Sequence, residues 1–205
     1  MNARIPFIAA PVLMLAYGVI RILDGLDGER GPGLAWTAGH LVFVVAMVMF
    51  LLVFGHLRRL AGRDLLSTVT VVVASAGAIA LIAQFGVDIV AGLLADDHAR
   101  MAEITRNVRS CRAVSLAVYD VGPYLFYAGQ FVLVVQLAVL RRIAGWTPLL
   151  LLADLVMPLI DKDLIPIGAA ALLVSFVSIG KRVPARVTRV SEDGRRASSA
   201  ASRVG

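Results

Sequence analysis

Polar side chains that could do chemistry occur inside apolar segments of this 205-residue chain. An ionised group at the centre of a bilayer costs about 2.5 to 3.5 kcal/mol on insertion scales, so such residues are informative. His40 lies one turn inside its apolar segment, and Asp120 lies near the start of another. Gln84 and Asp88 share one helical face because they are four residues apart. These four side chains are predicted to lie at a similar depth.

Pro123 makes the region around Asp120 more polar, because its missing N–H cannot pair with the carbonyl of Tyr119. Neighbouring tyrosines add hydroxyl groups. We therefore predict an outward-facing polar pocket formed by His40, Gln84, Asp88, Asp120, Tyr119, Tyr124 and Tyr127. The alternative interpretation is that the two acids are protonated or hydrogen-bonded contacts that hold helices together.

Asp154 is predicted to lie deeper, near the middle of its segment. Gln130 or Tyr127 would meet it if the two segments pack as antiparallel neighbours across the short turn at 141–142. One interpretation is a protonated, hydrogen-bonded aspartate. The other is a proton or cation relay through Asp154 and Gln130.

Several catalytic and cofactor patterns are incomplete. The three histidines cannot supply paired haem ligands, since His40 and His56 fall at opposite ends of one segment. The run 24–30 shares glycines and acids with metal-binding alcohol phosphatidyltransferases but lacks their downstream glycine and paired aspartates, so we interpret it as an acidic turn. The chain has no GxSxG, P-loop or GxGxxG motif. We expect no enzyme activity, no cofactor and no metal site.

The elements that must position these residues are apolar helices. The chain is 59% hydrophobic and 17% charged, compared with about 45 to 50% and about 25% in soluble domains. Six continuously apolar segments are predicted at 5–23, 34–57, 65–95, 114–140, 143–160 and 163–180. Because backbone groups in lipid must be satisfied within each segment, the predicted fold is an all-α, polytopic transmembrane bundle of about six spans over residues 1–180.

Arginines in short loops indicate the orientation of these spans. Arg58, Arg59 and Arg63 follow the second segment, and Arg141 and Arg142 follow the fourth. This distribution predicts a bacterial cytoplasmic membrane protein with both termini inside. The loop 96–113 is an exception, because it would lie outside yet carries four arginines.

The net charge of +6 is distributed between apolar segments and in residues 181–205, which we predict to be a disordered cytoplasmic tail. This distribution favours membrane lipids over nucleic acid as the partner of the basic residues. The tail either contacts anionic headgroups or only fixes the topology.

Two further segments have alternative interpretations. Residues 96–113 place Met101, Ile104 and Val108 at helical spacing, which predicts either a short interfacial helix or an outward extension of the next span. The third segment carries small residues that allow close helix approach, either within the bundle or in a homodimer. These residues are Ala74, Ser75, Gly77, Ala78 and Ala83.

Short motifs give a resemblance. Gly122-Pro123-Tyr124, Arg141-Arg142 and Trp146-Thr147-Pro148 resemble the C-terminal half of uncharacterised six-helix bacterial membrane proteins of a domain-of-unknown-function family. The runs 23–28 and 36–40 are similar to hypothetical membrane proteins of high-GC bacteria. The resemblance implies a six-helix fold and brings no known activity. We therefore expect an interaction or sensing component that has a membrane protein partner or forms a homodimer. The alternative is a small transporter or proton-coupled carrier that uses the intramembrane acids.

Overall fold

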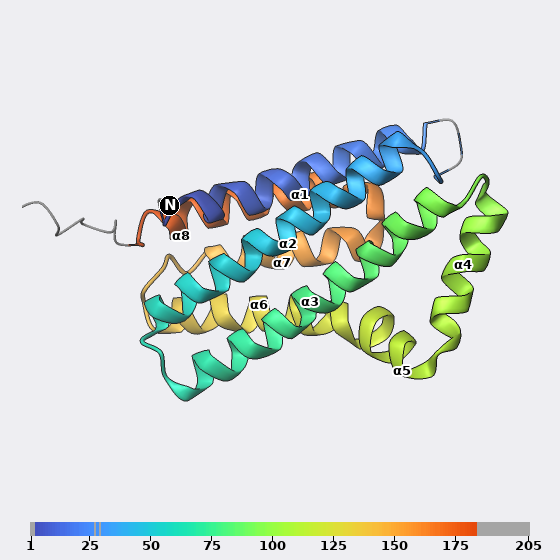
Figure 1. The fold of residues 1–205 in the computed structure, drawn as a ribbon. Coiled ribbons are helices and arrows are strands. Elements are labelled where there is room, and N and C mark those ends of the chain that lie inside the picture. The colour runs from blue at the N-terminus through green and yellow to red at the C-terminus, as the bar shows by residue number, and fades with distance from the viewer. Residues whose placement is uncertain (1–2, 27, 29, 184–205) are drawn as a thin grey trace, which may run out of the picture.

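The computed structural model describes residues 3–26, 28 and 30–183, which form helices and their connections (Figure 1). The elements in order are α1 (Ile5–Asp24), α2 (Leu34–Ala61), α3 (Leu65–Leu94), α4 (His98–Ser110), α5 (Arg112–Val114), the π-helix η1 (Ser115–Val121), α6 (Gly122–Val139), α7 (Thr147–Ile160), the 3₁₀-helix η2 (Lys162–Leu164) and α8 (Ile165–Gly180). This part of the chain contains no strand, so the predicted all-α bundle is confirmed. Most of the predicted tail, from residue 184 on, lies outside the described residues.

Five helical stretches are long and apolar enough to cross a membrane. They are α1, α2, α3, the stretch Arg112–Val139 that joins α5, η1 and α6, and the stretch Lys162–Gly180 that joins η2 and α8. The fifth predicted span, 143–160, is shorter than expected, because residues 140–146 form turns and α7 begins only at Thr147. At 1.5 Å per residue its 14 residues reach about 21 Å, less than the hydrocarbon core of about 30 Å.

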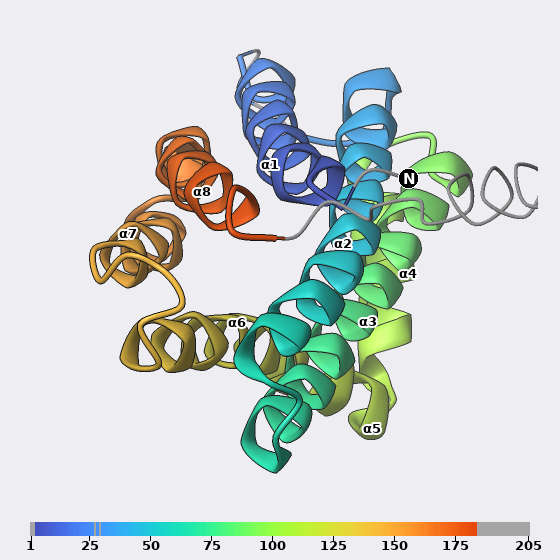
Figure 2. The ribbon, with the colours of Figure 1, turned by 90° about the vertical axis from the view of Figure 1, so that its left-hand side faces the viewer.

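Helices α1, α2, α3, α6, α7 and α8 are arranged around a common centre (Figure 2), which aromatic side chains occupy. Helix α1 packs against α2 and α8, α3 packs against α2 and α6, and α7 packs mainly against α8. The ring of Phe50 on α2 lies 5.1 Å from that of Phe126 on α6 and 5.8 Å from that of Phe176 on α8. Phe7 and Phe54 are fully buried beside them. Aromatic side chains therefore fill the space that the ribbon leaves open.

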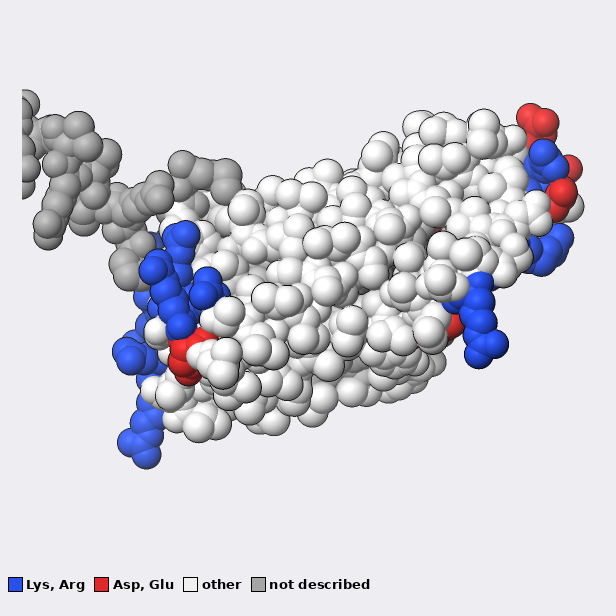
Figure 3. Space-filling model, turned by 60° about the horizontal axis from the view of Figure 1, so that its bottom comes forward, with Lys and Arg blue, Asp and Glu red and all other residues white. Residues whose placement is uncertain are grey.

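The surface between the two ends of the bundle is apolar. Figure 3 shows charged side chains gathered at the two ends, with an uncharged belt between them. Large apolar side chains remain exposed within this belt, for example Val72 at 63%, Ile79 at 58% and Val174 at 56%. Water-soluble monomers rarely expose apolar patches larger than a few hundred Å². The belt has the chemistry of a surface that faces hydrocarbon.

The ends differ in charge, and we name them accordingly. The basic end comprises the start of α1, the connections α2–α3 and α6–α7, and the end of α8. The mixed-charge end comprises the connection α1–α2, α4 and η2. The candidate pocket residues of α2 and α3 lie toward the mixed-charge end.

Small residues let α3 and α6 approach closely. A Cβ atom on Gly77 would lie 2.6 Å from the Cα of Phe126, and one on Gly129 would lie 2.7 Å from the backbone nitrogen of Ala74. Ala74, Gly77 and Ala78 are buried in this contact. Three of the small residues predicted on the third segment are therefore used inside the bundle, whereas Ser75 is half-buried and Ala83 is exposed.

Helix α4 is a separate helix and does not extend the next span. Asp97 caps its first turn by accepting a hydrogen bond from the backbone N–H of Arg100 at 2.8 Å. Cys111 then has an extended backbone, which separates α4 from α5. The helix runs across the mixed-charge end (Figure 1), with Met101, Ile104 and Val108 half-buried. Of the two alternatives for this segment, the arrangement fits the interfacial helix.

The chain around Asp120 adopts π-helical geometry over Ser115–Val121. Helix α6 follows directly, with Pro123 in its first turn. In a π-helix each carbonyl pairs with the N–H five residues on, as Gly122 N–H does with the carbonyl of Ala117. With this pattern, the carbonyl groups before Pro123 need not pair with the N–H that proline lacks. The missing N–H of Pro123 is therefore accompanied by a π-helical segment directly before α6.

The close contact of α3 with α6 predicts different outcomes for two glycines of α3. Gly77→Ala places a methyl group against the backbone of Phe126 and should destabilise the protein by about 1 to 3 kcal/mol through overpacking. Gly86→Ala is the matched control, because no atom lies within 4 Å of its Cβ position and alanine favours helix. Thermal unfolding in detergent, followed by circular dichroism, measures both. Equal melting temperatures would contradict the packing of α3 on α6.

Candidate functional site

The structure brings together two of the predicted pocket residues, His40 of α2 and Asp88 of α3. His40 Nε2 lies 3.9 Å from an Asp88 carboxyl oxygen, and the side chains are 9% and 17% exposed. His40 Nδ1 lies 2.7 Å from the carbonyl oxygen of Trp36, one turn earlier in α2. The imidazole is thus held between a backbone acceptor and a carboxyl group.

This geometry makes the pair a proton-binding unit. A carbonyl oxygen only accepts hydrogen bonds, so Nδ1 of His40 carries a hydrogen and donates it to Trp36. In a neutral imidazole Nε2 is then an acceptor, and it faces the Asp88 carboxyl. Two acceptors that face each other repel, so binding of one proton is favoured, either by the imidazole or by the carboxyl group.

Trp36 anchors this pair to α3. Its indole Nε1 donates a hydrogen bond to the carbonyl oxygen of Asp88 at 3.0 Å. The indole ring lies 4.0 Å from the His40 ring, measured between centroids. Gly92 makes room for it, since a Cβ there would lie 2.6 Å from the indole Cδ1. One tryptophan therefore contacts the histidine and bonds to the helix that carries the acid.

Aromatic rings surround the inner side of the pair. Phe85 lies 4.9 Å from His40 and stacks on Phe43 at 3.7 Å between centroids. Tyr17 of α1 packs edge-on to both His40 and Phe43. These rings limit solvation of the imidazole on its inner side. The accessible side of the imidazole therefore faces the mixed-charge end.

A small hollow adjoins the imidazole on that side. Its volume is about 10 Å³, enough for roughly one water molecule. Its lining comes from α1 and α2: Tyr17, Ile20, Arg21, Asp24, Ala35, Trp36, Gly39 and His40. A proton or a water can fit here, whereas an organic ligand cannot.

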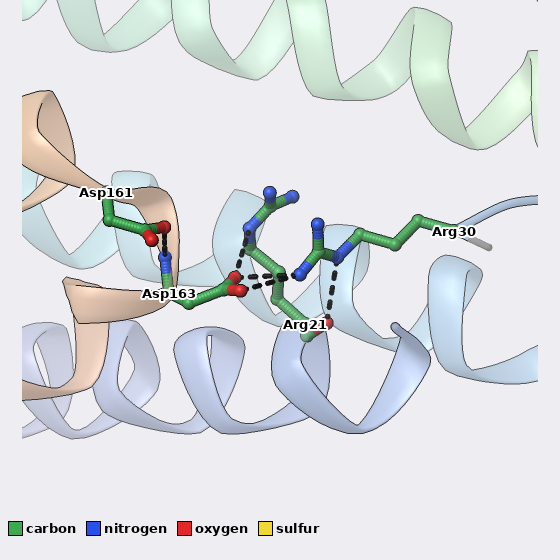
Figure 4. A network of polar contacts seen from close by, with 4 residues as sticks. All are labelled: Arg21, Arg30, Asp161 and Asp163. Atoms are coloured by element: carbon green, nitrogen blue, oxygen red, sulfur yellow. Dashed lines mark hydrogen bonds and ion pairs between the residues drawn. The ribbon is translucent and has the colours of Figure 1, made fainter. Parts of the chain in front are cut away.

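Arg21 extends the site to the connection between α7 and α8. Its Nε lies 3.6 Å from Asp163 of η2, and Nη2 of Arg30 donates to both carboxyl oxygens of Asp163 at 2.8 and 2.9 Å. Arg30 also donates to the carbonyl oxygen of Arg21 at 3.3 Å. Asp161 supports η2 by accepting a hydrogen bond from the backbone N–H of Asp163 at 2.8 Å (Figure 4). Asp163 of η2 is therefore ion-paired to α1 and to the loop that follows α1.

Tyr119 and Arg109 lie on the other side of Asp88. The guanidinium of Arg109 in α4 lies 4.8 Å from the centroid of the Tyr119 ring. Both residues interact electrostatically with Asp88. Gln84 is half-buried one turn before Asp88, and its Oε1 has no hydrogen-bond partner among the described residues. Helix α4 therefore adds a positive charge to the site.

Three of the predicted pocket residues lie elsewhere. Asp120 is exposed, and its nearest polar partner is the hydroxyl of Ser115 at 3.4 Å. Tyr124 is 68% exposed. Tyr127 lies on the inner side of α6, in electrostatic range of Asp154 and Tyr17. The single pocket predicted from sequence is therefore wrong in this respect: Asp120 of the π-helical segment and Tyr124 of α6 face outward, and Tyr127 lies on a different face of α6 from Tyr124.

The deeper candidates Asp154 and Gln130 are both buried. Asp154 of α7 packs against Gly168 of α8, where a Cβ would lie 3.0 Å from the Asp154 Cα. Gln130 is fully buried, and both polar atoms of its side chain lack hydrogen-bond partners among the described residues. Tyr127 is the residue of α6 that interacts with Asp154. The predicted meeting of α6 and α7 therefore takes place through the tyrosine.

The residues missed by the sequence reasoning are Tyr17, Arg21, Trp36, Phe85 and Arg109. Tyr17 and Arg21 are four residues apart near the end of the first span, a spacing that puts them on one face. That spacing is the feature of the sequence from which these two site residues could have been identified. The described residues hold no group of three or more His, Cys, Asp or Glu suited to a metal ion.

Comparisons of this chain with family models, curated proteins and solved structures gave no match. Its function is therefore argued from the site alone.

Trp36 provides an optical probe of the His40 proton. The chain has two tryptophans, so Trp146→Phe leaves Trp36 as the single emitter. A protonated imidazole quenches an adjacent indole, and we expect Trp36 fluorescence to fall reversibly as the pH is lowered. His40→Gln in the same background should abolish this response. A pH response that persists in His40→Gln would contradict the assignment of the proton to the pair.

Proposed function

We propose that this chain is an integral membrane protein that acts as a sensing or interaction component, with the His40–Asp88 pair as its proton-responsive element. The observation that carries the proposal is the position of the pair. It is a buried proton-binding unit with one hollow beside it, and that hollow is lined by Arg21, which is ion-paired to η2. No complete catalytic motif occurs in the sequence, and we propose no enzyme activity.

A change in protonation at His40 has a direct path to the surface. When pH falls and the pair gains a proton, its net charge becomes more positive. Arg21 interacts electrostatically with His40, so the added charge repels it. This repulsion weakens the contact of Arg21 with Asp163 and favours a looser connection between α1 and η2.

Other charged groups around the pair set the size of this effect. From α1 these are Arg21, Asp24 and the hydroxyl of Tyr17. From α4 and η1 they are Arg109 and Tyr119, which act on Asp88. Arg21 opposes a positive charge on His40, whereas the nearby Asp88 carboxyl favours it. Because these charges act in opposite directions at His40, the binding of a single proton changes the electrostatics of the site.

The proposed setting is a bacterial cytoplasmic membrane, with the basic end in the cytoplasm and both termini on that side. The excess of arginine and lysine in short connections at that end supports this orientation. The pair would then lie under the outer surface and respond to external pH. The change at η2 would be read by another membrane protein.

Spin labels on the two connections test the proposed response. In a Cys111→Ser background, Leu26→Cys and Lys162→Cys place labels on the α1–α2 loop and on η2. We expect the distribution of label distances, measured by pulsed electron resonance, to broaden when pH is lowered. His40→Gln should keep the narrow distribution because it cannot take up the proton.

The control for this experiment is Asp120→Asn, which removes an exposed acid outside the pair. It should respond as the parent protein does. A distribution that is independent of pH in the parent, or that broadens equally in His40→Gln, would refute the sensing role.

A proton-coupled carrier is the second candidate. The observation that favours it is the series of interacting groups from Asp88 through Tyr17 and Tyr127 to Asp154. The aromatic centre of Phe50, Phe126 and Phe176 opposes it, because these rings pack across the middle of the bundle. We therefore rank it below sensing.

Proton flux in reconstituted vesicles separates the two candidates. With a pH-sensitive dye inside, sensing predicts the same leak as protein-free vesicles. A carrier predicts flux that is lost in both Asp88→Asn and Asp154→Asn, with normal membrane levels of each variant. If the variants show only lower membrane levels, the two acids serve packing.

A further inference from the structure

The basic end concentrates cations from four separate parts of the chain. They are Arg4, Arg58, Arg59, Arg63, Arg141, Arg142, Lys181 and Arg182. Figure 3 shows basic side chains gathered at this rim of the apolar belt. Asp64 is the single acid of this end among the described residues, so eight cations accompany one carboxylate.

That carboxylate is occupied by local hydrogen bonds. Asp64 caps α3 by accepting from the backbone N–H of Ser67 at 2.7 Å, and the amide of Gln136 donates to it at 3.3 Å. These hydrogen bonds hold the pKa of Asp64 below its ordinary value. At the mixed-charge end, by contrast, Asp163 pairs with Arg21 and Arg30, and Glu103 pairs with Arg100. Among the described residues, the basic end therefore has more cations per carboxylate than the mixed-charge end.

Two arginines of the basic end occupy backbone conformations that favour glycine. Arg63 has φ of 60° and Arg141 has φ of 55°, both in the left-handed region. At Arg141 the turn is a helix C-cap in which the N–H of Arg142 bonds the carbonyl of Leu137, a place where glycine is the usual residue. Arginine is thus present in two separate turns at a conformational cost, which points to a use for its charge.

We propose that the cations of the basic end bind the phosphate headgroups of anionic phospholipids in the leaflet at that end. The cations lie at one rim of the apolar belt, on the face that Figure 3 shows, at the level that headgroups occupy when the belt lies in hydrocarbon. Phosphate oxygens would supply the negative charge that the described side chains of this end lack. The inference requires membrane insertion but not the sensing role, so either can fail without the other.

Retention of lipid during native mass spectrometry tests this surface. The protein is reconstituted in vesicles of phosphatidylcholine with phosphatidylglycerol, extracted, and analysed for bound lipid of each kind. We expect preferential retention of phosphatidylglycerol. Removing one surface charge should weaken it about fivefold, which is the effect of about 1 kcal/mol per charge.

The left-handed arginines provide the decisive variant. Arg63→Gly/Arg141→Gly removes two charges where glycine relieves the backbone, so the melting temperature should stay unchanged or rise while phosphatidylglycerol is lost. The matched control is Arg100→Gln/Arg106→Gln, which removes two charges from α4 at the mixed-charge end and should retain the lipid. If the glycine variant unfolds at lower temperature, Arg59→Gln/Arg142→Gln tests the same surface without touching the left-handed residues.

Three outcomes would overturn the inference. One is equal retention of both lipids by the unaltered protein. The second is undiminished phosphatidylglycerol on a folded variant of the basic end, which would leave these arginines with a topological role only. The third is an equal loss in the α4 control, which would mean that total charge matters and the rim does not.

Discussion

The constraint on which this structure depends is the pairing of backbone hydrogen bonds inside a continuous apolar belt. In hydrocarbon an unpaired N–H or C=O costs several kcal/mol, so each segment must form helix over its whole apolar length. The chain meets this requirement even at Pro123, where a change to π-helical geometry carries the chain past a missing donor. Non-helical backbone is mostly confined to the two ends, where water and charged side chains can satisfy it.

The same constraint requires that buried polar side chains either have a polar partner or be uncharged. His40 and Asp88 are kept because each lies against the other, with the Trp36 carbonyl and indole completing their contacts. Asp154 has no such partner among the described residues and packs on the Gly168 backbone, a setting that suits a neutral carboxyl group. The two sites differ in their access to the ends of the bundle. Arg21 ties the first to a surface loop, whereas the second is buried between α7 and α8.

The charges at the two ends follow different principles. At the mixed-charge end, carboxylates neutralise arginines and thereby hold loops together, as Asp163 does for Arg21 and Arg30. Surface ion pairs of this kind contribute modestly to stability, typically below about 1 kcal/mol each, but they fix which loops are neighbours. At the basic end the cations outnumber the carboxylates, and two of them occupy strained turns. The charges of one end are therefore used in internal contacts, whereas the other end has an excess of cations among the described residues.

The sequence by itself determined the all-α class, the starts of most helices and the polar character of the His40–Asp88 region, because apolar run length and helical spacing are local properties. The arginines of the short loops also indicated that one end of the bundle is basic. Only the tertiary structure decided that α7 is too short to match its neighbours, that Asp120 and Tyr124 face outward, and that Trp36 and Arg21 complete the site. These features depend on how helices far apart in sequence rotate against one another. A single π-helical segment is enough to change which side chains point inward, and apolar periodicity in a lipid-facing helix is too weak to reveal it.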